Sequence, residues 1–188
     1  LPLLTGKEAP HAPHLAVVAT PWAGQVALWS SVNDAGYALN TLIERAATLG
    51  VTETPLLRSD AGRWDRGPAL RVRLSRGHFA SAEVSEVLAG ANAVAIGDGS
   101  PANWEVFQFA EAELVGPATY ELHSRLRGQL GSDGVMPAIW PAGSLVILLD
   151  DALKQIDLPG SARGLERFYR IGAASRGYDA AETVVRNE

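Results

Sequence analysis

The chain has 188 residues, a formal net charge of −5, 47% hydrophobic residues and 20% charged residues. It is too apolar for a disordered protein, and its acidic balance gives no support to a nucleic-acid surface, which needs a basic face. It has no cysteine, which excludes disulfides and thiolate metal sites. No membrane span is predicted, because the longest apolar run, Leu145 to Leu149, is far shorter than the about 20 residues of a membrane helix.

The chain contains 19 glycines and 11 prolines without a regular period, which is typical of many turns between short strands. Residues 1–13 are rich in proline and are predicted to be a linker. Residues 14–174 are predicted to form a β-rich module, with a split into two subdomains near residues 60–70 as an alternative. Residues 175–188 are predicted to be a polar C-terminal extension.

The first part of the module is predicted to contain short apolar strands over residues 15–19 and 25–29, followed by a turn at residues 33–36. Apolar residues within 37–49 satisfy both the spacing of a helix and the alternation of a strand. We predict a strand there, because no residue caps a helix convincingly.

The middle of the chain begins with residues 59–68, which are polar and predict a surface loop. Leu70 to Leu74 alternates apolar and arginine side chains, the pattern of a half-buried strand. Residues 81–88 carry early glutamates and are followed by Gly90, which predicts one short helix. Residues 93–96 are predicted to be a strand.

The segment from Trp104 to Gly131 is the clearest structural signal in the chain. Extended, alternating residues on both sides of Gly116-Pro117 predict two strands joined in a hairpin. The first strand is predicted to carry Trp104, Val106 and Gln108 on one face and Glu105, Phe107 and Phe109 on the other.

The last part of the chain contains Leu145 to Leu149, which is predicted to be a strand buried on both faces. Residues 152–156 are predicted to be its hairpin partner, and residues 168–171 are predicted to be the last strand. The predicted fold is mainly β, an antiparallel sandwich or distorted barrel with one short helix.

Two patterns resemble ligand sites. Gly97-x-Gly99-x-x-Ala102 matches a dinucleotide fingerprint, but that motif needs a helix at its end, and Pro101 followed by a β-type segment favours a turn. Histidines could hold zinc, but those near the N-terminus have no third ligand nearby in sequence, so no metal site or cofactor is assigned. The histidines concerned are His11, His14, His78 and His123.

Glu111 and Glu113 share a strand face, as the paired carboxylates of a glycosidase would. Because they lie at a strand end beside a turn, we interpret them as solvated side chains. No nucleophile motif is present, so we predict no catalytic residue and no enzymatic activity.

Arginines recur at alternate positions and are expected to meet acidic neighbours, a partner surface or solvent; they are Arg71, Arg73, Arg76, Arg125 and Arg127. The tryptophans could form a sugar-binding platform, but most are expected to be core or interface anchors. These are Trp22, Trp29, Trp64, Trp104 and Trp140.

Several motifs resemble the C-terminal region of the tail-tip, or baseplate hub, protein ("megatron") of gene transfer agents and related long-tailed phages, whose family has an upstream TIM-barrel-like domain. The motifs lie mainly in the hairpin: Trp104-Glu105-Val106, Ala112-Glu113-Leu114-Val115, Tyr120-Glu121-Leu122 and Leu126-Arg127-Gly128-Gln129. Further agreement comes from Leu49-Gly50-Val51-Thr52, Trp64-Asp65-Arg66-Gly67, Gly90-Ala91-Asn92-Ala93 and Tyr169-Arg170-Ile171-Gly172. The resemblance covers about residues 20–172. It departs at Leu130, where the family pattern has arginine.

The resemblance implies a virion structural protein at the tail tip that serves assembly and host attachment or DNA delivery. It implies three copies around the tail axis, in contact with the distal tail protein, the hub and fibres. No direct nucleic-acid binding is expected, and contact with a cell-surface glycan is a further expectation. The alternative is a carbohydrate-binding β-module of a secreted or tail-borne enzyme.

Overall fold

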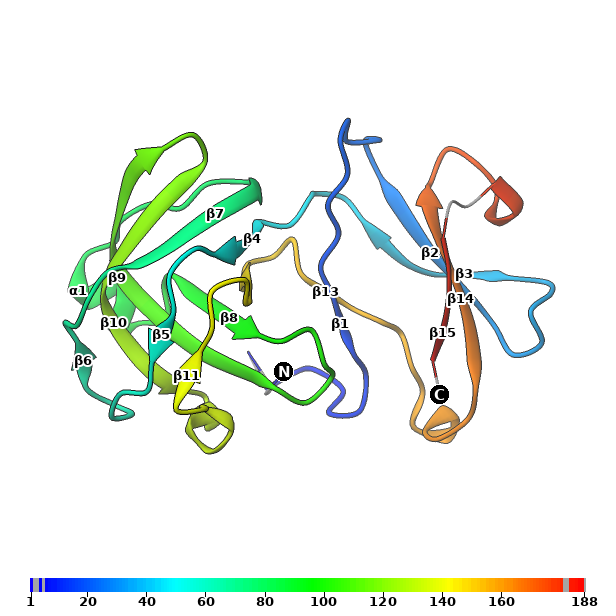
Figure 1. Cartoon of the computed structure of the whole chain (residues 1–188). Helices are drawn as coiled ribbons and strands as arrows, with labels where there is room; N and C mark the ends of the chain where they lie inside the picture. The colour runs from blue at the N-terminus through cyan, green and yellow to red at the C-terminus, as the bar shows by residue number, and fades with distance from the viewer. Residues whose placement is uncertain (2–3, 5, 181–182, 188) are drawn as a thin grey trace. The chain divides into compact units, whose positions relative to one another are not determined.

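The computed structural model describes residues 1, 4, 6–180 and 183–187. The chain divides into two compact units (Figure 1): one contains Ala47–Asp150 and the described residues before Lys7, and the other contains Lys7–Ala46 and the described residues from Asp151 onward. The polar loop near residues 60–70, where the sequence suggests a split, lies inside the first unit. No helix of the described part of the chain has the length and hydropathy that crossing a bilayer requires.

The first unit is a closed antiparallel barrel of six strands, in the order β4-β7-β10-β9-β8-β12 and back to β4. The strands are β4 (Leu49–Thr52), β7 (Leu70–Arg76), β8 (Ala93–Gly97), β9 (Trp104–Gly116), β10 (Thr119–Gln129) and β12 (Leu145–Leu148). A seventh strand, β6 (Trp64–Asp65), pairs with β10, and β5 (Leu56–Leu57) pairs with β11 (Ile139–Trp140). Closure gives each of the six barrel strands a partner on both sides, whereas β6 is an edge strand. The predicted fold class is confirmed, and of its two forms the barrel is present.

The barrel core is built by alternation. Along β7, Leu70, Val72 and Leu74 are buried, whereas Arg71 and Arg73 are exposed, as the sequence predicts. The core cluster includes Val94, Ile96, Phe107, Phe109, Leu122 and Val146 from the other strands. Phe79 packs edge-on against Phe109 with ring centroids 5.2 Å apart.

The first half of β9 is buried on both faces, because α1 (Val84–Leu88) and η1 (Ser132–Val135) cover its outer side. Gln108 Nε2 donates to the carbonyl oxygens of Val87 and Ala91 at 2.5 and 2.8 Å. The predicted helix is present as α1, which is shorter than the predicted range of residues 81–88. A capping box formed by Glu83 and Glu86 starts it.

The hairpin of β9 and β10 is confirmed. Its strands meet at a two-residue loop, because Thr119 pairs with Gly116 and only Pro117 and Ala118 lie between them. At the far end of β10, Gly128 has a φ of +62°, and a Cβ there would lie 2.8 Å from Cβ of Asp133. Only glycine fits this position, so Gly128 lets η1 pack against β10.

The second unit is a four-stranded antiparallel sheet in the order β15-β14-β2-β3, with a two-stranded ribbon of β1 and β13. Its elements are β1 (His14–Leu15), β2 (Val26–Ser31), β3 (Ala38–Ile43), β13 (Lys154–Gln155), η2 (Gly160–Ala162), β14 (Arg167–Ala173), η3 (Tyr178–Ala180) and β15 (Thr183–Asn187). Val26, Leu28, Ile43 and Tyr169 form its core.

Several expectations concern residues of the second unit. Residues 38–43 are a strand, as predicted for the ambiguous segment. Residues 152–156 do not form a hairpin with β12: the strand there, β13, pairs with β1, while β4 and β8 fill both edges of β12. Within the predicted C-terminal extension, residues 183–187 form β15 beside β14. Residues 1–13 are predicted to be a linker, but His11 belongs to the second unit and contacts it. Its Nε2 lies 2.9 Å from the carbonyl oxygen of Leu158.

Candidate functional site

A fully buried ion pair joins the two strands of the hairpin. Arg127 on β10 and Glu105 on β9 are both 0% exposed. Nε and Nη2 of Arg127 donate to Oε1 and Oε2 of Glu105 at 2.6 and 2.8 Å, a bidentate arrangement. Trp140 Nε1 donates to Oε2 at 2.7 Å, and the Gly128 amide donates to Oε1 at 3.3 Å. Every oxygen of this buried carboxylate is therefore satisfied.

A second buried pair lies beside the first. Nε and Nη2 of Arg125 donate to Oδ2 of Asp65 at 3.1 and 3.0 Å, and its Nη1 donates to the carbonyl oxygen of Leu122 at 2.7 Å. Burial opposes ionisation of Asp65, but the amide of Gly67 and the Arg125 guanidinium outweigh it and hold the pKa of Asp65 below its ordinary value. Arg127 Nη1 also donates to the carbonyl oxygen of Leu57 at 2.7 Å. The two arginines thus fasten β5 and β6 to the barrel.

The structure decides between the alternatives expected for these arginines. Arg125 and Arg127 share one strand face, as alternation predicts, and of the three expected surroundings they meet acidic neighbours and not solvent. Their partners Glu105 and Asp65 lie in the motifs Trp104-Glu105-Val106 and Trp64-Asp65-Arg66-Gly67, far away in sequence. The outward arginines of β7 behave as expected. Arg71 pairs with Glu121, and Arg73 Nε lies 2.9 Å from Oε1 of Glu53.

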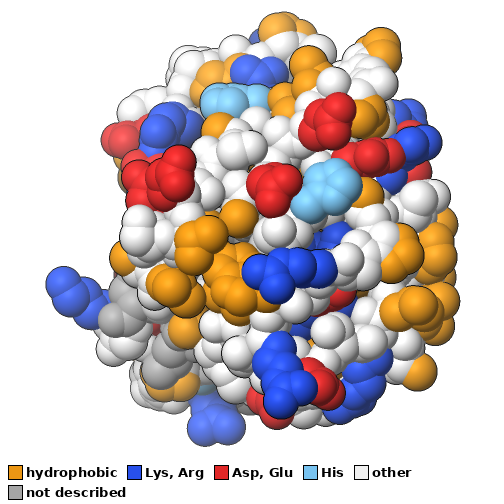
Figure 2. All heavy atoms as spheres, turned by 90° about the vertical axis from the view of Figure 1, so that its left-hand side faces the viewer, with side chains coloured by type: hydrophobic (Ala, Val, Ile, Leu, Met, Phe, Trp, Pro, Cys, Tyr) orange, Lys and Arg blue, Asp and Glu red, His pale blue; other side chains and the backbone are white. Residues whose placement is uncertain are grey.

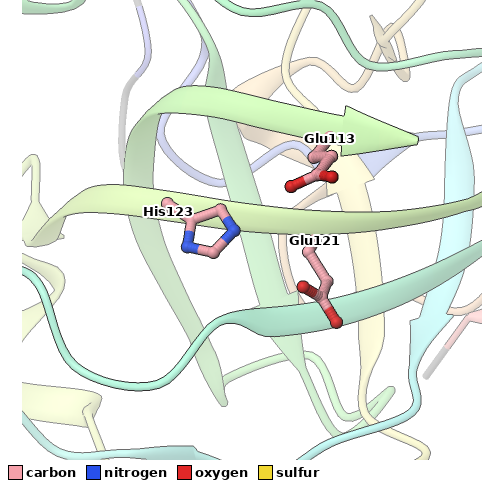
Figure 3. Close-up of side chains that lie close together, drawn as sticks. All are labelled: Glu113, Glu121 and His123. Atoms are coloured by element: carbon pink, nitrogen blue, oxygen red, sulfur yellow. The ribbon is translucent and has the colours of Figure 1, made fainter. Parts of the chain in front are cut away.

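A cluster of three potential metal ligands lies on the outer face of the hairpin (Figure 3). Glu113 on β9 is directly opposite Glu121 on β10, and His123 follows Glu121 by two residues on the same strand. One ligand atom from each side chain lies within 4.8 Å of the others. Nε and Nη2 of Arg71 both donate to Oε1 of Glu121, at 3.1 and 2.5 Å.

Glu111 is not part of this cluster, although the sequence places it on the same strand face as Glu113. Its Oε1 accepts a hydrogen bond from Ser124 Oγ at 2.9 Å. Glu111 lines an open hollow of about 470 Å³ together with Glu83 and Glu86. The side chains of Glu83 and Glu86 form the capping box of α1. Each carboxylate of the hollow therefore has a local structural partner.

A cleft of about 490 Å³ lies beside the buried arginine pairs. Its walls are Thr54 to Ser59 and Gly67 to Ala69, and they are mostly apolar. Arg125 and Asp65 reach the cleft, but they already bond to each other. Arg58 also lines the cleft, and its Nη1 donates to the carbonyl oxygen of Met136 at 2.6 Å. Each charged group among the described lining residues therefore has a partner.

The glycine-rich segment after β8 is a turn, as predicted. It leads into β9 at Trp104, so the helix that a pyrophosphate site needs does not follow it. Within the turn, the Ser100 amide donates to Oδ1 of Asp98 at 2.9 Å and Asn103 Nδ2 donates to Oδ2 at 2.8 Å. Hydrogen bonds from Ser100 and Asn103 lower the pKa of Asp98 to about 2.

We expect the Asp98 carboxylate to titrate with a midpoint near pH 2 in a carbon-detected NMR experiment, against an ordinary value of 3.8. Because the folded pKa is depressed, the turn gains stability from Asp98 above the ordinary value and loses it as the pH falls toward 2. Asn103→Ala removes one donor and should move the midpoint upward. An unchanged midpoint in that variant would show that the Asn103 bond is not formed in solution.

The histidines do not gather into one site. The only described group of three or more metal-ligating side chains is Glu113, Glu121 and His123, so His11, His14 and His78 fall outside it. His14 lies in β1, where burial lowers its pKa. His78 is exposed beyond β7.

None of the five tryptophans is exposed. Trp140 and Trp29 are buried in core clusters, Trp22 and Trp64 pack against others, and Trp104 Nε1 donates to the carbonyl oxygen of Ser100 at 2.6 Å. Apart from Tyr178, the large apolar side chains exposed in the described part of the chain are aliphatic. Figure 2 shows groups of them among charged residues on the side of the barrel that carries α1. The exposed aliphatic side chains include Val84 and Leu88 on α1 and Leu114 and Val115 near the hairpin loop.

Comparison with known families gives one match. The family model described as Rcc01698-like, C-terminal matches residues 47–147, just over half of the chain and almost all of the barrel unit. No curated protein matches the chain.

Proposed function

This chain belongs to the Rcc01698-like, C-terminal family, and we propose that it is a structural module of the tail tip of a gene transfer agent or related phage particle. The family match is the main support for this proposal. It covers residues 47–147, which is almost the whole of the barrel unit, Ala47–Asp150. The family name is associated with gene transfer agents.

The way the barrel uses its charged residues supports a structural role. The motif residues Glu105, Arg127 and Gly128 fix β9, β10 and η1 to one another. Asp65 and Arg125 fasten β6 to the same strands. These four charged side chains are thus committed to internal bonds. We propose that the module has no enzymatic activity.

The proposed location is the baseplate, where three copies surround the tail axis and contact the distal tail protein, the hub and fibres. The acidic net charge of −5 disfavours direct DNA contact and is compatible with a protein scaffold. Exposed aliphatic side chains such as Leu57, Ile139 and Leu114 offer apolar area for such contacts. Host attachment or DNA delivery would then be functions of the assembled tip.

An affinity experiment tests this proposal. The tagged 188-residue chain is incubated with proteins from disrupted particles, and an unrelated β-barrel domain of similar net charge is the control. We expect the tagged chain, and not the control, to retain tail proteins, among them the distal tail protein. If it retains none and remains monomeric while it cleaves a polysaccharide, the assembly role is wrong.

A further inference from the structure

We propose that Glu113, Glu121 and His123 bind one divalent transition-metal ion of the zinc class on the outer face of the β9–β10 hairpin. This inference does not depend on the tail-tip proposal, because it rests on three side chains of one hairpin. It would give the barrel a metal site separate from the buried arginine pairs.

The first argument is geometric. Pairing of Glu121 with Glu113 puts one carboxylate from each strand on the same face, and His123 joins them from the next outward position of β10. Figure 3 shows the three side chains close together on one face of the sheet. Zinc binds nitrogen and oxygen at about 2.0–2.2 Å in a tetrahedral arrangement, so its ligand atoms lie about 3.4 Å apart. The three ligand atoms lie within 4.8 Å of one another, and the exposed Glu113 side chain would have to turn inward to complete the site.

The second argument concerns charge. Two carboxylates directly opposite each other in an antiparallel pair repel, which destabilises the hairpin unless a cation lies nearby. Arg71 supplies part of this compensation, but both of its hydrogen bonds end on Oε1 of Glu121. The second oxygen of that carboxylate remains as a ligand. A hydrogen-bonded partner that orients a ligating carboxylate is a common feature of metal sites.

The third argument identifies the ion. The donors are one imidazole nitrogen and two carboxylate oxygens, a set that suits zinc, cobalt or nickel. Calcium and magnesium prefer ligand sets made of oxygen alone, whereas His123 contributes an imidazole nitrogen to this cluster. Three protein ligands leave a fourth position for water. The positive charge of Arg71 weakens cation binding, so we expect a reversible site and not a permanently occupied one.

Calorimetric titration of the 188-residue chain with zinc chloride tests the proposal, after removal of metal by a chelator. We expect saturation at one ion per chain. His123→Ala should weaken binding at least tenfold, and Glu113→Gln should also weaken it while preserving the shape of the side chain.

Two controls address other histidines and carboxylates. His78→Ala and Glu111→Gln alter exposed groups outside the cluster and should leave zinc affinity unchanged. Circular dichroism should show that all variants remain folded, since the changed side chains are at least partly exposed. The proposal is overturned if the parent chain shows no saturable binding or if His123→Ala binds as tightly as the parent. It is equally overturned if only the double variant His11→Ala/His14→Ala loses the ion.

Discussion

Replacement of Arg127 by alanine is expected to lower the free energy of unfolding of the barrel unit by about 3–5 kcal/mol. Arg127 and Glu105 are both 0% exposed, and the substitution leaves the Glu105 carboxylate buried without its cation. The hydrogen bonds from Trp140 and Gly128 remain, but they cannot neutralise the charge. Urea unfolding followed by tryptophan fluorescence measures the change.

Two variants sharpen this test. Arg63→Ala removes a surface ion pair whose side chains are 80% and 78% exposed, and it should change stability by less than about 0.5 kcal/mol. The double variant Glu105→Leu/Arg127→Met removes both charges and should be more stable than Arg127→Ala, because it leaves no unpaired buried ion. A loss of under about 1 kcal/mol in Arg127→Ala would contradict the buried ion pair.

Replacement of Phe109 by alanine is expected to cost about 3–5 kcal/mol of unfolding free energy. Phe109 is 0% exposed, and its ring packs edge-on against Phe79 inside the barrel. The substitution removes apolar burial and leaves a cavity that a closed barrel can collapse only in part. Denaturant unfolding gives the value directly.

The matched control lies on the same strand. Leu114 is 63% exposed near the hairpin loop, so Leu114→Ala should change stability by less than about 0.5 kcal/mol. If the two substitutions had equal effects, the assignment of inner and outer faces along β9 would be wrong.

Local patterns predicted much of the fold. Alternation along Leu70 to Leu74 placed the inward side chains of β7 correctly, and Gly116-Pro117 placed the hairpin loop. The partners of distant strands could not be predicted in this way. Nothing in the local sequence of β12 shows that it pairs with β4 and β8, and residues 152–156 looked like its nearer neighbour. Barrel closure is a property of such long-range pairings.

The outer cluster was missed for a related reason. The two-residue loop alone would place Glu113 opposite Leu122. An irregularity between Thr119 and Tyr120 shifts the register by one residue and places Glu121 opposite Glu113. Because of this shift, Glu113 faces the carboxylate of Glu121 and not the apolar side chain of Leu122. Residue types in the hairpin do not reveal it, so the sequence led to a comparison of Glu113 with Glu111 instead.

The measurement that tests the proposed assembly role most directly is a cryo-electron-microscopy map of the purified particle to which we assign this chain. We expect density for the six-stranded barrel at the tail tip, repeated three times around the tail axis and in contact with neighbouring tail proteins. A map that accounts for the whole tail tip without this barrel would contradict the role proposed here.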